Sequence, residues 1–448
     1  MRLISAFTSN TDKALWRLAL PMIFSNITVP LLGLVDTAVI GHLDSPVYLG
    51  GVAVGSMVTS FLFMLLLFLR MSTTGLAAQA LGAQEPQRLA KAFIQPLLLA
   101  LVAGVAIVLL RAPLITLALQ IVGGDQQVLA QARLFLEIRW LSAPAALANM
   151  VLLGWLLGVQ YVRAPVILLL VGNLLNIVLD IWLVMGLGWN VQGAAAATVI
   201  AEYSTLLLGL WLAWRVLHIR GISLGMLRGA WRGNLRRLLA LNRDIMLRSL
   251  LLQLCFASLT ILGARMGSEV VAVNAVLMNL LTFTAYALDG FAYAVEAHSG
   301  QAYGARDDRL LRQVWWAACR QACLVALGFA AIYMFAGQQI VAVLTSLPEL
   351  RVLANHYLPW QVVLPLVGVW CYLLDGMFIG ATRGAEMRNS MAVAAAGYGL
   401  MLFTLPVLGN HGLWLALVVF LALRGAALGW IWHRHRVRGT WFLPGSNG

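Results

Sequence analysis

The segment AQALGAQEPQRL at residues 78–89 returns in altered form as GQAYGARDDRLL at residues 300–311, an offset of 222 positions. The same offset aligns small residues elsewhere, namely Gly41 with Gly263, Ala53 with Ala275, Gly154 with Gly376 and Gly158 with Gly380. A repeat of this kind is the sequence signature of a structure built from similar units. We therefore predict that the chain of 448 residues contains two copies of one structural pattern, each close to half its length.

The composition indicates that both copies lie in a membrane. Hydrophobic residues make up 61% of the chain and charged residues only 10%, too few to cover a soluble protein of this size. Apolar runs of about 20 residues, the length that crosses a bilayer as a helix, recur throughout. We predict an all-α membrane protein with twelve transmembrane helices, centred near residues 27, 58, 101, 145, 175, 203, 256, 283, 325, 363, 399 and 422.

The basic residues indicate how these helices are oriented. The formal net charge is +13, but the arginines and lysines gather in alternate loops, which is typical of membrane topology rather than of nucleic-acid binding. The short loops at 41–48, 186–193 and 409–412 contain no Lys or Arg. We expect a multi-pass protein of the bacterial inner (plasma) membrane, with both termini in the cytoplasm and membrane lipid around it.

Six helices in each copy give the copies the same orientation in the membrane. We predict an N-lobe over residues 1–217, a basic cytoplasmic loop over 218–243 and a C-lobe over 244–448. Two parallel lobes are typical of transporters that rock around a central cavity. The alternative is a duplication that serves packing alone.

The segment GNLLNIVLDIWLV at 172–184 places polar side chains inside an apolar span. Asn173, Asn176 and Asp180 fall on one helical face, at positions i, i+3 and i+7. Asp36 lies in the otherwise apolar first span, and the sixth span adds Thr198 and Glu202. A charged group facing lipid is costly, so we expect these side chains to face protein or water, with Asn176 and Asp180 close to Asp36.

Close carboxylates in a poor dielectric resist joint ionisation. Such a site binds a proton, a small hard cation such as Na⁺, or a cationic substrate. The alternative is that the asparagines and acids only join helices by hydrogen bonds.

The second copy carries its own polar side chains. Tyr286, Asp289, Tyr293 and Glu296 follow one face of the eighth span, and Asp375 lies in the tenth. Carboxylates beside aromatic rings suit an organic cation, because the ring face attracts positive charge. We predict these five residues, with Asn173 and Glu202, as candidates for lining a substrate cavity.

Motifs of catalysis are absent from the sequence. It has no P-loop, HExxH, GxSxG with triad partners or metal-spaced Cys/His cluster, and no extramembrane segment long enough for an ATPase domain. We therefore predict neither an enzyme nor a metal site nor a cofactor. Uphill transport would draw on an ion gradient.

Several stretches together resemble the multidrug and toxic compound extrusion (MATE) family. They are VDTAVIGHL (35–43), LGGVAVG (49–55), GLAAQALGAQ (75–84), NIVLD (176–180) and GAAAATVIAEY (193–203). ALDGFAYAVEAHSGQAYGA (287–305) resembles the DinF-type branch of that family. The resemblance covers nearly the whole chain and implies twelve helices in two lobes, with export of organic, often cationic compounds against proton or sodium entry.

The resemblance also implies roles for single residues. Asp36 corresponds to a first-helix acid linked to proton coupling, and Pro21 to a proline at which that helix bends. Asn176, Asp180 and Thr198 match a polar network of the N-lobe. Asp375 is a candidate for a tenth-helix acid implicated in sodium binding in another branch, but the seventh-helix acid of that branch has no counterpart between residues 245 and 266.

The sequence therefore favours a monomeric efflux antiporter that exchanges cationic or amphipathic drugs for protons. Sodium coupling stays open as one alternative. A second is a flippase for a lipid-linked sugar, which would use cationic side chains in its cavity. Arg70, Arg139, Arg320 and Arg424 near the span ends keep that alternative open.

Overall fold

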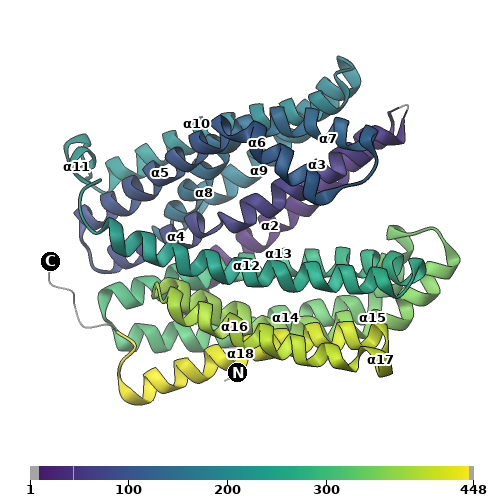
Figure 1. Ribbon diagram of the computed structural model, residues 1–448. Helices are drawn as coiled ribbons and strands as arrows, with labels where there is room; N and C mark the ends of the chain where they lie inside the picture. Colours follow the sequence, from purple (N-terminus) through teal and green to yellow (C-terminus); the bar gives the residue numbers. More distant parts are fainter. Residues whose placement is uncertain (1–9, 44, 443–448) are drawn as a thin grey trace. The chain divides into compact units, whose positions relative to one another are not determined.

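The computed structural model describes residues 10–43 and 45–442 (Figure 1). Both chain ends, for which the sequence predicts a cytoplasmic position, lie outside these residues. Within the described part the chain forms helices and short connections and contains no strand. The all-α prediction is confirmed.

Twelve stretches of the described chain are long and apolar enough to cross a membrane, and each contains one predicted centre. They are Asn10–Gly41, Pro46–Gly82, Pro86–Leu109, Gln126–Gly158, Arg163–Gly186, Asn190–Ile219, Leu235–Arg265, Ser268–Ala305, Asp308–Leu344, Pro348–Gly380, Gly384–Leu408 and Asn410–Arg438. The fourth and tenth are the most buried of these stretches. Within their apolar parts 72% and 67% of the residues are buried, so protein covers them more than lipid does.

The chain divides into two compact units, Met1–Ile23 with Ala240–Gly448, and Phe24–Leu239. Two helices pass from one unit to the other, α2 (Asn10–Gly41) and α12 (Leu235–Arg265). The α12 helix begins inside the segment 218–243 that the sequence assigns to a loop.

The remaining helices belong to one unit each. The unit Phe24–Leu239 contains α3 (Pro46–Leu65), α4 (Phe68–Gly82), α5 (Pro86–Leu109), α6 (Arg111–Val122), α7 (Gln126–Arg139), the 3₁₀ turn η1 (Trp140–Ser142), α8 (Ala143–Gly158), α9 (Arg163–Asp180), the π-helical turn η2 (Ile181–Gly186), α10 (Asn190–Ile219) and α11 (Leu224–Gly229). The other contains α13 (Ser268–Ala305), α14 (Asp308–Leu344), α15 (Pro348–Gly380), α16 (Gly384–Met401), η3 (Leu402–Thr404), α17 (Leu405–Leu408) and α18 (Asn410–Arg438).

The α4 and α8 helices pack closely because α8 presents glycines to its neighbour. A Cβ atom on Gly154 would lie 2.5 Å from the Arg70 carbonyl oxygen, and one on Gly158 would lie 2.8 Å from that of Thr74. Glycines four residues apart let two membrane helices bring their backbones together.

The unit that contains residues 240–448 repeats this contact between α13 and α15. A Cβ on Gly376 would lie 3.0 Å from the Ala292 carbonyl oxygen, and one on Gly380 would lie 2.9 Å from that of Glu296. Each glycine and each carbonyl lies 222 positions after its counterpart in the first unit. The predicted repeat is therefore confirmed at this helix pair, and Glu296 now stands where the first copy has Thr74.

We expect Gly154→Val to lower thermal stability, because the added atoms overlap the α4 backbone and overpacking costs about 1–3 kcal/mol. The measurement is the melting temperature of the purified protein. Gly328→Val is the matched control, because a Cβ at that position of α14 meets no atom within 4 Å. Equal melting temperatures for the two variants would contradict the packing described here.

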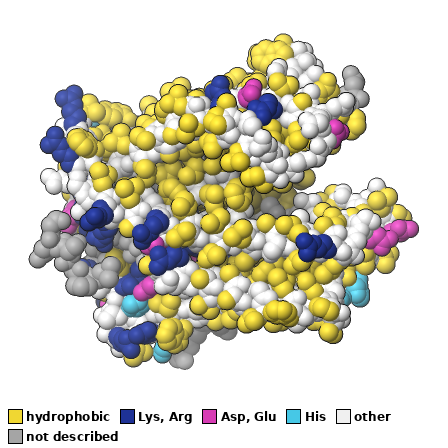
Figure 2. All heavy atoms as spheres, in the orientation of Figure 1, with side chains coloured by type: hydrophobic (Ala, Val, Ile, Leu, Met, Phe, Trp, Pro, Cys, Tyr) yellow, Lys and Arg dark blue, Asp and Glu magenta, His cyan; other side chains and the backbone are white. Residues whose placement is uncertain are grey.

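Apolar side chains cover much of the face drawn in Figure 2. Leu207, Phe335 and Val407 are 71%, 79% and 86% exposed. A surface of this composition suits contact with lipid rather than with water. In the view of Figure 2, most of the Lys and Arg side chains lie toward the left, near the ends of the helices.

Candidate functional site

The carboxyl groups of Asp36 and Asp180 meet inside the unit Phe24–Leu239. Asp36 is half-buried on α2, and Asp180 is fully buried at the last residue of α9. The two carboxyl groups lie close enough to interact directly with each other. Within the described residues neither oxygen of Asp180 accepts from an amide, hydroxyl or guanidinium group. Two neighbouring carboxyl groups can share a hydrogen bond only when one of them carries a proton.

The helix changes its geometry directly after Asp180. The α9 helix ends there and the chain continues as the π-helical turn η2. Such turns are rare and often occur at functional sites. No signal in the segment IWLVMG predicted it.

The asparagines upstream of Asp180 join α9 to its neighbours. The Asn173 side chain donates to the Thr28 hydroxyl of α2 at 2.7 Å. Buried Asn176 accepts from the Thr198 hydroxyl of α10 at 3.4 Å. The stripe predicted from GNLLNIVLDIWLV therefore contacts side chains of neighbouring helices, and its last member, Asp180, lies beside Asp36.

Glu202 and Arg139 extend this polar cluster. The Glu202 carboxylate accepts from the Asn149 amide of α8 at 2.8 Å. The Arg139 guanidinium lies in the electrostatic range of both Glu202 and Asp36, and it stacks over the Phe63 ring at 5.2 Å. The cluster thus contains one guanidinium group and three carboxyl groups, those of Asp36, Asp180 and Glu202. Asn149 was not predicted, because one asparagine in an apolar span is a weak signal.

The acids of the second copy lie in different surroundings. Asp375 is buried on α15, where one of its oxygens accepts from Arg248 of α12 and from Arg424 of α18, both at 2.7 Å. We call these three residues the C-unit ion cluster. Asp289 of α13 lies in the electrostatic range of Arg424 and of the Tyr372 hydroxyl.

The other residues predicted for this copy share the α13 helix. Glu296 is almost completely buried, and Tyr286, Asp289 and Tyr293 are partly buried. The sequence did not predict the C-unit ion cluster. Arg248 follows the basic loop at 218–243 and lies inside α12, and no feature of the sequence pairs it with Asp375.

Twelve apolar helices in two repeated units, with carboxyl groups buried among them, define a membrane transporter. The chain belongs to the MatE family, whose model matches residues 21–182 and 245–407. This confirms the resemblance found in the sequence, and it makes the chain a multi-pass membrane transporter of that family and not an enzyme.

Individual relatives extend the comparison. The chain is 75% identical to DNA damage-inducible protein F of Escherichia coli (strain K12) over 437 residues, which cover 98% of this chain and 95% of that protein. It is 26% identical to the probable multidrug resistance protein NorM of Acinetobacter baylyi, over 92% of this chain and 93% of the relative.

Solved structures share the fold. The chain matches a multidrug resistance MATE family transporter of the MOP superfamily, solved in an outward-facing conformation, with a TM-score of 0.87, 22% identity and 98% coverage of both chains. It matches a MATE structure in a straight conformation with a TM-score of 0.84. These matches confirm the predicted two-copy, twelve-helix fold class.

Proposed function

We propose that this transporter exports organic cationic or amphipathic compounds in exchange for protons. The observation that carries the proposal is the proximity of half-buried Asp36 to buried Asp180, because the two carboxyl groups can hydrogen-bond to each other only when one of them holds a proton. The compound class rests on relatives named as multidrug resistance and DETOXIFICATION proteins. The chain needs no cofactor beyond the coupling ion.

The pair couples proton binding to the position of α2. When the shared proton leaves, two negative charges face each other in a poor dielectric and repel. Asp180 is held in the protein interior, so the repulsion between the two carboxylates displaces α2, which carries Asp36. That helix contains Pro21, which lacks a backbone N–H and favours a bend. Pro21 lies two residues before the point at which α2 leaves one compact unit and enters the other.

The polar residues around the pair have supporting roles in this proposal. Asn176 and Thr198 hold α9 and α10 together beside the proton site. Glu202 adds a negative charge that attracts a cationic compound. In the other unit, the α13 face with Tyr286, Asp289, Tyr293 and Glu296 offers rings and carboxyl groups of the kind that recognise organic cations.

Two alternatives receive less support. A sodium site at Asp375 would need a carboxylate whose negative charge is not already neutralised. Two guanidinium groups form ion pairs with that carboxylate. A flippase for a lipid-linked sugar would need arginines available for a pyrophosphate. Arg424 pairs with Asp375, Arg320 pairs with Asp12, and Arg139 interacts with two acids.

Proton coupling predicts which gradient drives transport. In proteoliposomes, accumulation of a fluorescent organic cation should follow an imposed pH gradient and persist without sodium. A protonophore should collapse it. Accumulation that follows a sodium gradient and ignores pH would contradict proton coupling, and transport of a lipid-linked sugar alone would favour the flippase.

We further propose that both termini lie on the cytoplasmic side of the bacterial inner membrane, because the basic residues collect in alternate loops. We also propose that the protein acts as a monomer. A green fluorescent protein fused after residue 448 should fluoresce in cells, and alkaline phosphatase fused there should be inactive. An active phosphatase would reverse the proposed orientation.

A further inference from the structure

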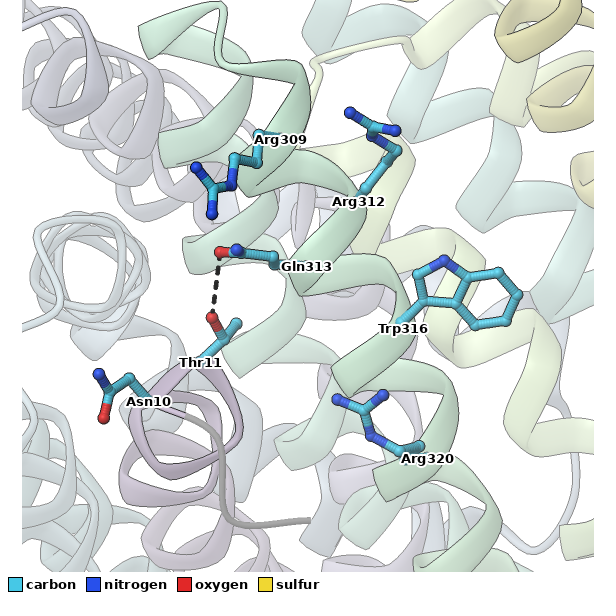
Figure 3. A pocket seen from close by; sticks show the side chains of 7 residues that line it. All are labelled: Asn10, Thr11, Arg309, Arg312, Gln313, Trp316 and Arg320. Carbon is cyan, nitrogen blue, oxygen red and sulfur yellow. Dashed lines mark hydrogen bonds between the residues drawn. The ribbon is translucent and has the colours of Figure 1, made fainter. Parts of the chain in front are cut away.

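The start of α14 and the first turn of α2 line an open pocket of about 760 Å³ (Figure 3). Its lining is polar and basic except for one indole, and consists of Asn10, Thr11, Arg309, Arg312, Gln313, Trp316 and Arg320. The Thr11 hydroxyl donates to the Gln313 side chain at 3.5 Å, which joins the two walls. No carboxylate lines the pocket among the residues that the structure describes.

The three arginines have unequal numbers of acidic partners. Arg320 is paired with buried Asp12 at 2.9 Å. Arg312 lies 3.2 Å from Asp308, an acid that Arg436 also contacts. Arg309 is exposed and has no carboxylate within 4.0 Å among the described residues. The pocket therefore has an excess of positive charge at Arg309 and Arg312.

The same face of α14 turns apolar immediately beyond the pocket. Trp316, Leu327 and Met334 lie at i, i+11 and i+18, within about 20° of one another around the helix. They are 60%, 58% and 69% exposed. Arg309 falls on the same face, 20° from Trp316 by the same count. From Trp316 to Leu327 the helix rises about 16 Å, which is the depth of one leaflet.

We propose that this pocket binds the headgroup of an anionic phospholipid. The phosphate lies between Arg309 and Arg312, the Trp316 indole sits at the level of the lipid carbonyls, and an acyl chain follows α14 past Leu327. Basic pockets at helix ends bind such headgroups, and tryptophan favours the membrane interface. A soluble phosphate would use the arginines but not the exposed apolar stripe that follows them.

The site has a consequence for the transport cycle. Asn10 and Thr11 belong to α2, the helix that carries Asp36, and the pairing of Arg320 with Asp12 ties that helix to α14. A bound lipid therefore contacts the end of the helix that the proton site moves.

Native mass spectrometry of the full chain in detergent tests the site. Phosphatidylglycerol should bind more tightly than phosphatidylcholine with the same acyl chains. The double variant Arg309→Gln/Arg312→Gln should lose about 25-fold in affinity, because each basic side chain near an anionic headgroup contributes about fivefold. Trp316→Ala should weaken phosphatidylglycerol binding as well.

The control removes the same charge elsewhere. Arg434→Gln/Arg438→Gln, at the end of α18, should bind phosphatidylglycerol within about twofold of the wild type. Equal losses in both double variants, or no preference for phosphatidylglycerol in the wild type, would overturn the proposal. So would full displacement of the lipid by an equal concentration of glycerol phosphate, because the site would then recognise phosphate without a chain. Melting temperatures without lipid establish that each variant is folded.

Discussion

Asp36→Asn is expected to abolish uphill export while leaving the protein folded and able to bind its compounds. An asparagine has the shape of a protonated aspartate, and its amide group can donate a hydrogen bond to Asp180 as a protonated Asp36 would. The variant therefore mimics the protonated state permanently and cannot release a proton. Export driven by a pH gradient in proteoliposomes should fall to the level of empty vesicles.

The matched control is Asp125→Asn in the same unit. Asp125 is an exposed N-cap residue whose side chain accepts a hydrogen bond from the backbone N–H of Gln127. Asparagine caps a helix equally well. This variant should transport like the wild type. Wild-type export by a normally inserted Asp36→Asn protein would remove Asp36 from the mechanism.

Asp375→Ala should cause the largest loss of stability of the variants considered. It removes the carboxylate of the C-unit ion cluster and leaves Arg248 and Arg424 buried without that partner. Their side chains are only 9% and 4% exposed. Removing one member of a buried ion pair costs about 3–5 kcal/mol. We expect a clear fall in melting temperature.

Two further variants calibrate this effect. Arg248→Met keeps the pair of Asp375 and Arg424 and replaces a charge with an apolar chain, so its loss should be smaller. Glu137→Ala breaks an ion pair whose members are 38% and 45% exposed, and should change stability by less than about 1 kcal/mol. An Asp375→Ala protein that melts with the wild type would show that the cluster does not stabilise the fold.

The sequence predicted the features that follow from hydropathy and spacing. Twelve apolar runs place twelve helices because lipid forces the backbone to satisfy its own hydrogen bonds. The offset of 222 residues predicted two copies of one pattern, and the aligned Gly154 and Gly376 make equivalent helix contacts in the two copies. The stripe of Asn173, Asn176 and Asp180 could be assigned to the protein interior because desolvation excludes it from lipid.

Features that depend on three-dimensional partners could not be predicted in this way. Arg248 comes shortly after a run of basic residues in the sequence, and only the packing of α12 against α15 brings it to Asp375. Asn149 belongs to the polar cluster because it donates a hydrogen bond to Glu202, which lies 53 residues away in the sequence. The π-helical turn after Asp180 depends on how α9 packs, and apolar residues alone do not encode it. In each case the signal is a tertiary contact rather than a local pattern.

The most direct test of the account is whether binding of an organic cation displaces the shared proton. Tetraphenylphosphonium is added to purified protein in weakly buffered detergent, and a pH-sensitive dye reports the protons released. The wild type and Asp125→Asn should release about one proton per molecule, because the carboxyl pair titrates as a unit. Asp36→Asn and Asp180→Asn should release none. Equal proton release from the wild type and Asp36→Asn would contradict the central claim that this pair carries the coupling proton.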